Sequence, residues 1–150
     1  PLSFAMYAER NRNEIVKLLL DAGANANSVE YYNDSILHRA ASCNDPELIS
    51  LLIDYGANIN AKNDRGFTPL HVAAYYGNYN TVKILLEKGV DVNVRTNPRY
   101  YSEETPIMLD KGDTALYEAK CQYRQKYLEH TTHSKLKNTI QILEEHGAEE

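Results

Sequence analysis

The chain has 150 residues, which is the length of one ordinary domain. Its 21 acidic residues outnumber its 16 lysine and arginine residues, and the net charge of −5 argues against a nucleic acid backbone as the main partner. No stretch of about 18 apolar residues occurs, so the sequence predicts no membrane-spanning helix.

The two cysteines, Cys43 and Cys121, lie far apart in the sequence. A disulfide framework is not expected from such a pair, and a reducing compartment suits them. No secretory signal peptide is visible. We therefore expect a cytoplasmic location, or the host-cell cytosol if the chain is a secreted effector. The tyrosine- and asparagine-rich sequence would suit the AT-rich genome of an intracellular bacterium or a large virus.

Residues 1–27 predict two helices, the first over Pro1–Met6 and the second over Glu14–Leu20. We expect Leu2 and Leu18 to be exposed unless a further helix pair covers them. In natural proteins built of repeated helix pairs, the two end faces are polar. Exposed leucines at this end are typical of a fragment of a longer repeat protein.

Residues 28–60 begin with the predicted tip of a hairpin, Tyr31–Asp34. Asn33 in this tip suits a positive φ. Ser35 is placed to cap a short helix, and Asp45-Pro46 combines a capping side chain with a proline at the first helical position of the next helix.

Residues 61–93 repeat the same order of elements. Asn63–Gly66 is a good type I turn sequence. Thr68-Pro69 is a favourable helix start, and Gly77 can end that helix with a positive φ. A second helix is predicted over Thr81–Lys88.

Three glycines, Gly23, Gly56 and Gly89, each follow an apolar helix and are spaced by 33 residues. A period of this length indicates a solenoid of stacked helix–turn–helix units. Together with the segment TPLHVAAYYG at residues 68–77, the pattern resembles that of the ankyrin repeat family. The resemblance covers most of residues 1–96 and returns at residues 113–149.

The resemblance implies one all-α solenoid domain with β-hairpin-like tips. Its repeats would cover approximately residues 1–27 (partial), 28–60, 61–93 and 94–150. The last of these departs from the period, because the next helix-ending glycine, Gly147, comes 25 residues late. We assign the excess to a long loop over residues 97–112 and to a capping helical hairpin, residues 114–147, whose two helices are longer by one to two turns and whose bend lies near Thr131-Thr132.

The family resemblance also implies a function, which is recognition of a protein partner by the concave face, where the tips and the first helices lie. Carried over to this sequence, the partner-contacting positions are Tyr7, Ala8, Val29, Tyr31, Tyr32, Asp34, Ser42, Cys43, Lys62, Asp64, Arg65, Phe67, Tyr75 and Tyr76. Tyrosine and arginine are enriched at the energetic centres of interfaces. Alternatively, Tyr75 or Tyr76 packs against a neighbouring repeat. Tyr100 and Tyr101, in the long loop, would either enlarge the same surface or partly block it.

His38 and His71 occupy matching places in successive repeats. A catalytic base is needed once, whereas a structural hydrogen bond is needed in every copy. The resemblance implies that each imidazole bonds within its own hairpin and to the next repeat.

Catalytic motifs are missing from the sequence, which contains no nucleophile elbow, phosphate-binding glycine loop or Cys-x-x-Cys pair. We therefore expect a non-catalytic, monomeric interaction module without a cofactor, a nucleic acid partner or membrane insertion. One alternative is the targeting arm of a larger enzyme or of a bacterial or viral effector. Another is a metal or catalytic site in the C-terminal hairpin, built from Cys121, His130, His133 and His146.

Overall fold

The structure is a computed structural model that describes residues 2–8, 10–97, 113–125 and 130–149. The described residues form eight α-helices and one short 3-10 helix. In chain order they are α1 (Leu2–Ala5), α2 (Arg12–Asp21), η1 (Tyr31–Asn33), α3 (Ile36–Ser42), α4 (Pro46–Asp54), α5 (Pro69–Tyr76), α6 (Tyr79–Glu87), α7 (Ala115–Gln125) and α8 (His130–Glu145).

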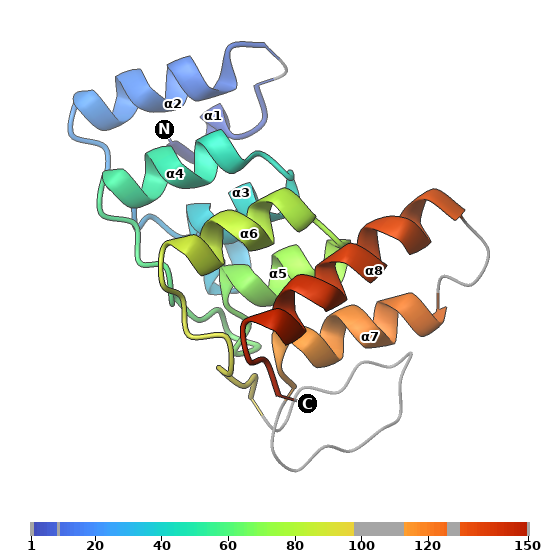
Figure 1. Ribbon diagram of the computed structural model, residues 1–150. Helices are drawn as coiled ribbons and strands as arrows, with labels where there is room; N and C mark the ends of the chain where they lie inside the picture. Colours follow the sequence, from blue (N-terminus) through green and yellow to red (C-terminus); the bar gives the residue numbers. More distant parts are fainter. Residues whose placement is uncertain (1, 9, 98–112, 126–129, 150) are drawn as a thin grey trace.

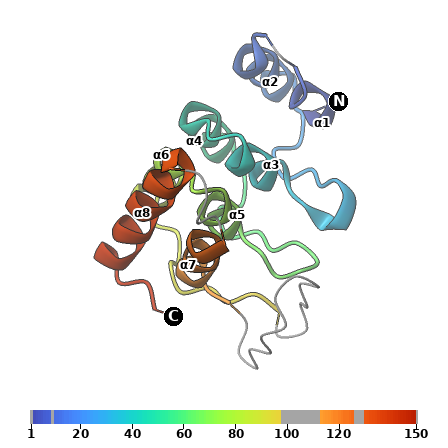
Figure 2. The same cartoon turned by 90° about the vertical axis from the view of Figure 1, so that its right-hand side faces the viewer.

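The helices stack as two parallel rows (Figure 1). We call α1, α3, α5 and α7 the inner row, and α2, α4, α6 and α8 the outer row. Within the rows α3 packs on α5, α5 on α7, α4 on α6 and α6 on α8. Figure 2 shows that the tips between repeats project from the inner row, on the side away from the outer row. This arrangement is the all-α repeat solenoid expected from the sequence.

Local sequence accounts for where the inner helices begin. Ser35 precedes α3 with an extended backbone, and its N–H donates to His38 Nδ1 at 3.1 Å. The N–H of Thr68 donates in the same way to His71 Nδ1 at 3.2 Å. In the outer row, the Asp45 carboxylate accepts from the N–H of Leu48 at 3.0 Å, so it caps α4 as expected.

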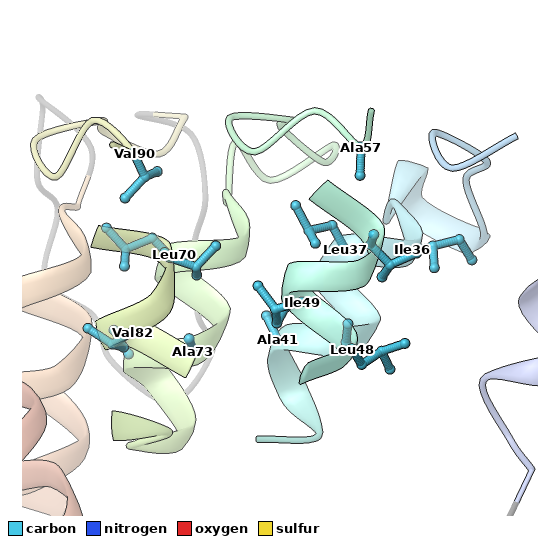
Figure 3. Close-up of a cluster of buried hydrophobic side chains, with 14 of the residues drawn as sticks. Ile36, Leu37, Ala41, Leu48, Ile49, Ala57, Leu70, Ala73, Val82 and Val90 are labelled. Atoms are coloured by element: carbon cyan, nitrogen blue, oxygen red, sulfur yellow. The ribbon is translucent and has the colours of Figure 1, made fainter. Parts of the chain in front are cut away.

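The core lies between the two rows and continues from repeat to repeat (Figure 3). Leu37 and Leu70, at matching positions of the inner row, are 0% and 1% exposed. Ala40 and Ala73 are fully buried, and their small side chains allow neighbouring helices to come close. Each repeat therefore depends on its neighbours to bury its apolar side.

The C-terminal helices repeat the contacts made between earlier repeats. The side-chain oxygen of Asn27 accepts a hydrogen bond from the N–H of Asn58 at 2.7 Å, and its side-chain amide donates to the Gly56 carbonyl at 2.9 Å. Asn93 makes the matching bonds to Glu149 (2.8 Å) and Gly147 (3.2 Å). The helices α7 and α8 thus continue the row in the same register.

The end repeats agree only in part with what the sequence predicts. Leu18 is 62% exposed, as expected, but Leu2 is only 2% exposed because it packs into the core in the same way as Leu37. With 11 and 16 residues, α7 and α8 are longer than α5 and α6, which confirms their predicted lengthening. The predicted bend near Thr131-Thr132 is wrong, since both residues already belong to α8.

Gly56 provides a test of the repeat geometry. Its φ is +84°, and a Cβ at this position would meet no atom within 4 Å. Replacing Gly56 by valine should therefore lower the free energy of unfolding through backbone strain alone, by about 2–3 kcal/mol. Chemical denaturation followed by circular dichroism measures this loss. Gly56→Asn is the control, because asparagine tolerates a positive φ and should cost clearly less. Equal stability of the valine variant and the parent chain would contradict the assignment.

Candidate interaction surface

The tip of the second repeat presents three large side chains to solvent. Tyr31 is 89% exposed, Tyr32 68% and Val29 53%. The hairpin is closed by an N–H of Glu30 that donates to the carbonyl of Asp34 at 2.8 Å. These side chains are therefore carried on an ordered turn rather than buried in the core.

Two successive residues of this turn have a positive φ. Tyr32 and Asn33 both have a φ of +59°, and the N–H of Asp34 donates to the carbonyl of Tyr31 at 3.3 Å. The positive φ of Asn33 confirms the sequence-based prediction. That of Tyr32 was not foreseen, because turns with two such residues usually use asparagine, aspartate or glycine.

The tips of the second and third repeats are joined to one another. The N–H of Asp64 donates to the carbonyl of Tyr32 at 3.0 Å, and the side-chain amide of Asn63 donates to the Asp34 carboxylate at 2.7 Å. The guanidinium carbon of Arg65 lies 5.6 Å from the centroid of the Tyr32 ring, within the range of a cation–π contact. The two tips consequently form one continuous surface.

The row of tips continues toward the C-terminal helices. Asn97 donates its backbone N–H to the carbonyl of Arg65 at 3.1 Å and its side-chain amide to the carbonyl of Asp64 at 3.0 Å. Lys62 extends to the carbonyl of Arg95 at 3.0 Å. The same kind of tip-to-tip bond therefore recurs along the solenoid.

Further aromatic side chains lie on the inner row. The Tyr7 ring is 60% exposed, and the Arg39 guanidinium carbon lies 4.5 Å from its centroid. Tyr76 is 49% exposed, and its ring meets the half-buried Tyr75 edge to face, with centroids 5.1 Å apart. Ser42 is half-buried and donates its hydroxyl to the carbonyl of Arg39 at 2.8 Å.

Phe67 does not lie on the exposed surface, where the family resemblance placed it. It is only 8% exposed, and its ring stacks on that of His71 with the centroids 5.7 Å apart. Its backbone carbonyl accepts the bond from His38. Phe67 thus packs the base of the tip and does not reach a partner's side of the surface.

The other residues that the family resemblance implied form an exposed group and a half-buried group. Exposed residues are Tyr7, Val29, Tyr31, Tyr32, Cys43, Lys62, Asp64, Arg65 and Tyr76, and half-buried ones are Ala8, Asp34, Ser42 and Tyr75. Tyr100 and Tyr101 lie outside the described residues. The two ends of their segment are joined, because Thr96 donates its N–H to the Asp113 carbonyl at 3.0 Å and its hydroxyl accepts from the N–H of Asp113 at 2.8 Å.

The two histidines make the structural bonds that the resemblance implied. His38 Nε2 lies 2.8 Å from the carbonyl of Phe67 in the next repeat, and His71 Nε2 lies 3.0 Å from the carbonyl of Asp113. In each case the other ring nitrogen accepts a backbone N–H within its own repeat. Both rings are therefore neutral, with the proton on Nε2, and each connects two successive repeats.

Burial lowers the pKa of both imidazoles, and that of His71 falls from 6.5 to about 4. The backbone carbonyls that accept from Nε2 raise these two pKa values, but by less than burial lowers them. Protonation of His71 would place a charge in the core and a proton on Nδ1, which already faces the N–H of Thr68. The folded state therefore favours the neutral ring.

The C-terminal hairpin was the alternative location for a metal or catalytic site. Across the described parts of the chain, no three His, Cys, Asp or Glu side chains come together in a way that could hold a metal ion. The ring of His133 stacks on Tyr123 with centroids 3.8 Å apart, and His146 Nδ1 lies 2.8 Å from the carbonyl of Ile142. Burial raises the pKa of the half-buried Cys121 thiol. The side chain of His130 lies outside the described residues.

The lowered pKa of His71 predicts a pH dependence of stability. The unfolded chain takes up the proton near pH 6.5, whereas the folded chain resists it until about pH 4. Stability is therefore fully present above pH 6.5, and about 2 kcal/mol should be lost by pH 5 through this group. We expect His71→Gln to be less stable at pH 7 but to lose less between pH 7 and pH 5, as measured by denaturant unfolding at both values. Parallel losses in the two proteins would exclude His71 as the titrating group.

A profile of ankyrin repeats, in three copies, matches residues 2–96. The search of curated proteins found no match. None of the helices in the described residues is long and apolar enough to span a membrane. Since the matched segment is more than half of the chain and its repeats stack as the sequence predicted, this protein belongs to the ankyrin repeat family.

Proposed function

We propose that this chain binds a protein partner through the surface formed by its tips and inner helices, without catalysing a reaction. Ankyrin repeats generally serve as protein-interaction modules. The observation that carries the proposal for this chain is the exposed tip with Tyr31 and Tyr32, joined to the tip of the third repeat. We call this region, with Tyr7, Val29, Asp64, Arg65 and Tyr76, the tip surface.

The chemistry of the tip surface supports a protein partner. A tyrosine offers a large ring and a polar hydroxyl, and it loses little rotamer entropy when a partner covers it. Arg65 lies over the Tyr32 ring and Arg39 over the Tyr7 ring, which holds these rings in defined orientations before binding. A surface ordered in advance has a lower entropic cost of association.

The backbone at Tyr32 supports the same conclusion. A left-handed backbone costs an ordinary L-residue about 1–2 kcal/mol. The exposed Tyr32 ring recovers little of this by burial, and a cation–π contact at an exposed site contributes only about 0.5–1 kcal/mol. Stability therefore does not account for a tyrosine at this position, whereas a role in binding does.

The proposed partner-binding set is narrower than the set carried over from the family. It keeps Tyr7, Val29, Tyr31, Tyr32, Asp34, Ser42, Lys62, Asp64, Arg65, Tyr75 and Tyr76, and it omits Ala8, Cys43 and the buried Phe67. Tyr100 and Tyr101 stay predictions from the sequence. A monomeric chain in a reducing compartment suits this role. If the chain is the targeting arm of a larger enzyme or effector, the tip surface has the same task.

We further propose that residues 113–149 are the last repeat of a single domain. His71 bonds to Asp113 as His38 bonds to Phe67, and Gly147 has a φ of +78° as the earlier helix-ending glycines do. Glu144 and Glu145 are exposed on α8, which gives this end of the row a polar surface. The contribution of its own tip, which holds Tyr100 and Tyr101, stays a prediction from the sequence.

A substitution at Tyr32 tests the proposal because it separates binding from stability. Tyr32→Asn relieves the strain and should raise the free energy of unfolding by about 0.5–1 kcal/mol, since asparagine tolerates a positive φ. The same variant should lose most of its partner binding. The partner would be captured from cell lysate on the immobilised chain, identified by mass spectrometry and then titrated against both proteins.

Tyr55→Asn is the matched control for this experiment. Tyr55 is 38% exposed and follows α4 in the outer row, where its hydroxyl donates to the Asp21 carboxylate. We expect it to bind the partner as the parent chain does. A Tyr32 variant with undiminished affinity, or a Tyr55 variant that binds no partner, would contradict the assignment of the tip surface.

A second pair of tyrosines defines how far the surface extends along the inner row. Replacing Tyr75 and Tyr76 together by alanine should weaken binding of the same partner by at least about tenfold, because two aromatic contacts are removed. The melting temperature of the double variant should change little, because Tyr76 is 49% exposed. Unchanged affinity of the double variant would restrict the binding site to the tips.

A further inference from the structure

Four side chains that become negatively charged on losing a proton lie together around the first turns of α7. We call Asp113, Tyr117, Glu118 and Cys121 the α7 acid group. The charges of Asp113 and Glu118 act on both Tyr117 and Cys121, and the last two share a hydrogen bond. None of these four side chains belongs to the tip surface.

Glu118 is the most buried member of this group. It is 8% exposed, and within the described part of the chain no hydrogen bond or ion pair reaches its carboxylate. A carboxylate in such a place is costly when it is ionised. Its two oxygens are not among the unbonded polar atoms that are closed to solvent in the described residues, so the carboxylate is still in contact with solvent. Oδ1 of Asp113 is one of those closed atoms.

Positively charged side chains around the group act on residues other than Glu118. Lys120 of α7 pairs with Glu144 of α8, with Nζ and Oε1 3.0 Å apart. Arg95 acts on Asp113. Among the described groups, the influences on Glu118 are burial and the charge of Asp113, and both raise its pKa, to about 7.

The helices packed against α7 do not supply the missing positive charge from their described groups. On α5, His71 is neutral near pH 7, and Tyr75 is an uncharged phenol. On α8, His133 stacks on Tyr123, and the lysines are exposed. Within the described residues, Glu118 therefore has no counter-charge.

The register of the repeats places Glu118 next to the tyrosines of the inner row. Glu118 holds in α7 the place that Arg39 holds in α3, four residues after the hydroxyl residue that precedes the helix. The Arg39 guanidinium carbon reaches back to Tyr7 of the preceding repeat, 4.5 Å from the ring centroid. In α5 the place of Tyr7 is taken by Tyr75, and α5 packs on α7 (Figure 2). Glu118 therefore faces the side of the inner row that carries Tyr75.

We propose that the α7 acid group receives one lysine or arginine side chain of the protein partner, with the positive charge beside Glu118 and the ring of Tyr75. This proposal rests on the proposed binding function and specifies the chemistry of the partner at one point. Ammonium and guanidinium groups donate hydrogen bonds to carboxylates and are attracted to aromatic rings. A metal ion is a poorer occupant, because no three His, Cys, Asp or Glu side chains converge in the part of the chain that the structure describes.

Ionisation of Glu118 makes this contact depend on pH. With a pKa of about 7, the carboxyl of the free chain is mostly protonated at pH 6 and mostly ionised at pH 8. A bound cation favours the ionised form and so displaces the proton. The affinity for a basic side chain should therefore rise by about tenfold between pH 6 and pH 8. Glu118→Gln should remove this dependence, because an amide does not titrate in this range.

The test follows the isotope-labelled chain by NMR during titration with blocked glycine peptides that carry one central lysine, arginine or glutamine. At pH 8 the lysine and arginine peptides should shift the carboxyl resonance of Glu118 until saturation and lower its titration midpoint, whereas the glutamine peptide should do neither. In Glu118→Gln the accompanying shifts of the α7 backbone amides should disappear. Glu47→Gln is the matched control, because Glu47 is exposed on α4, and it should keep the response of the parent chain.

The proposal is wrong if neither basic peptide shifts the Glu118 resonance, or if the glutamine peptide shifts it as strongly. It is also wrong if the affinity of the basic peptides stays constant or falls between pH 6 and pH 8. These titrations use the parent chain, so their outcome does not depend on how any variant folds.

The captured partner separates this contact from the tip surface as a whole. We expect both Tyr32→Asn and Glu118→Gln to weaken its binding, and the Glu118 variant alone to lose the pH dependence. Weakening by Tyr32→Asn but not by Glu118→Gln would leave the tip surface intact and overturn the basic contact. Weakening by Glu118→Gln but not by Tyr32→Asn would support the basic contact and overturn the tip surface.

Discussion

The structure depends on buried, neutral imidazoles that join the second repeat to the third and the third to the last. His38 accepts the N–H of Ser35 at the start of α3 and donates to the carbonyl of Phe67 in the following hairpin. One side chain thus fixes where a helix begins and where the next tip lies. His71 repeats this arrangement toward Asp113. Because these bonds position the tips, the orientation of the exposed tyrosines depends on residues that lie far from solvent.

Features set by local sequence could be predicted, and these include most of the fold. The positive φ of Gly56 and the capping of α4 by Asp45 follow from short motifs, whereas the paired bonds of the histidines were implied by the family resemblance. A period also reveals which residues perform a task that every repeat needs. For this reason the sequence correctly assigned His38 and His71 to structure and not to chemistry.

Features set by contacts between distant residues could not be predicted as well. Phe67 belongs to a tip by its position, yet its ring turns inward and stacks on His71. An apolar residue between polar tip residues and the helix start was the one signal that pointed to burial. The left-handed backbone of Tyr32 had no signal at all, since the sequence favours only its neighbour Asn33 there. Leu2 is buried because α1 keeps the register of α3 at the end of the row.

The modular construction links the buried core to the tip surface. Stacking a repeat buries one apolar face and, through bonds such as that between Asp64 and Tyr32, also extends the row of tips by one unit. The two ends of the row differ in this respect, since α8 exposes charged side chains whereas α1 and α2 expose Phe4 and Leu18. The length of the tip surface is therefore set by the number of repeats that the core holds in register.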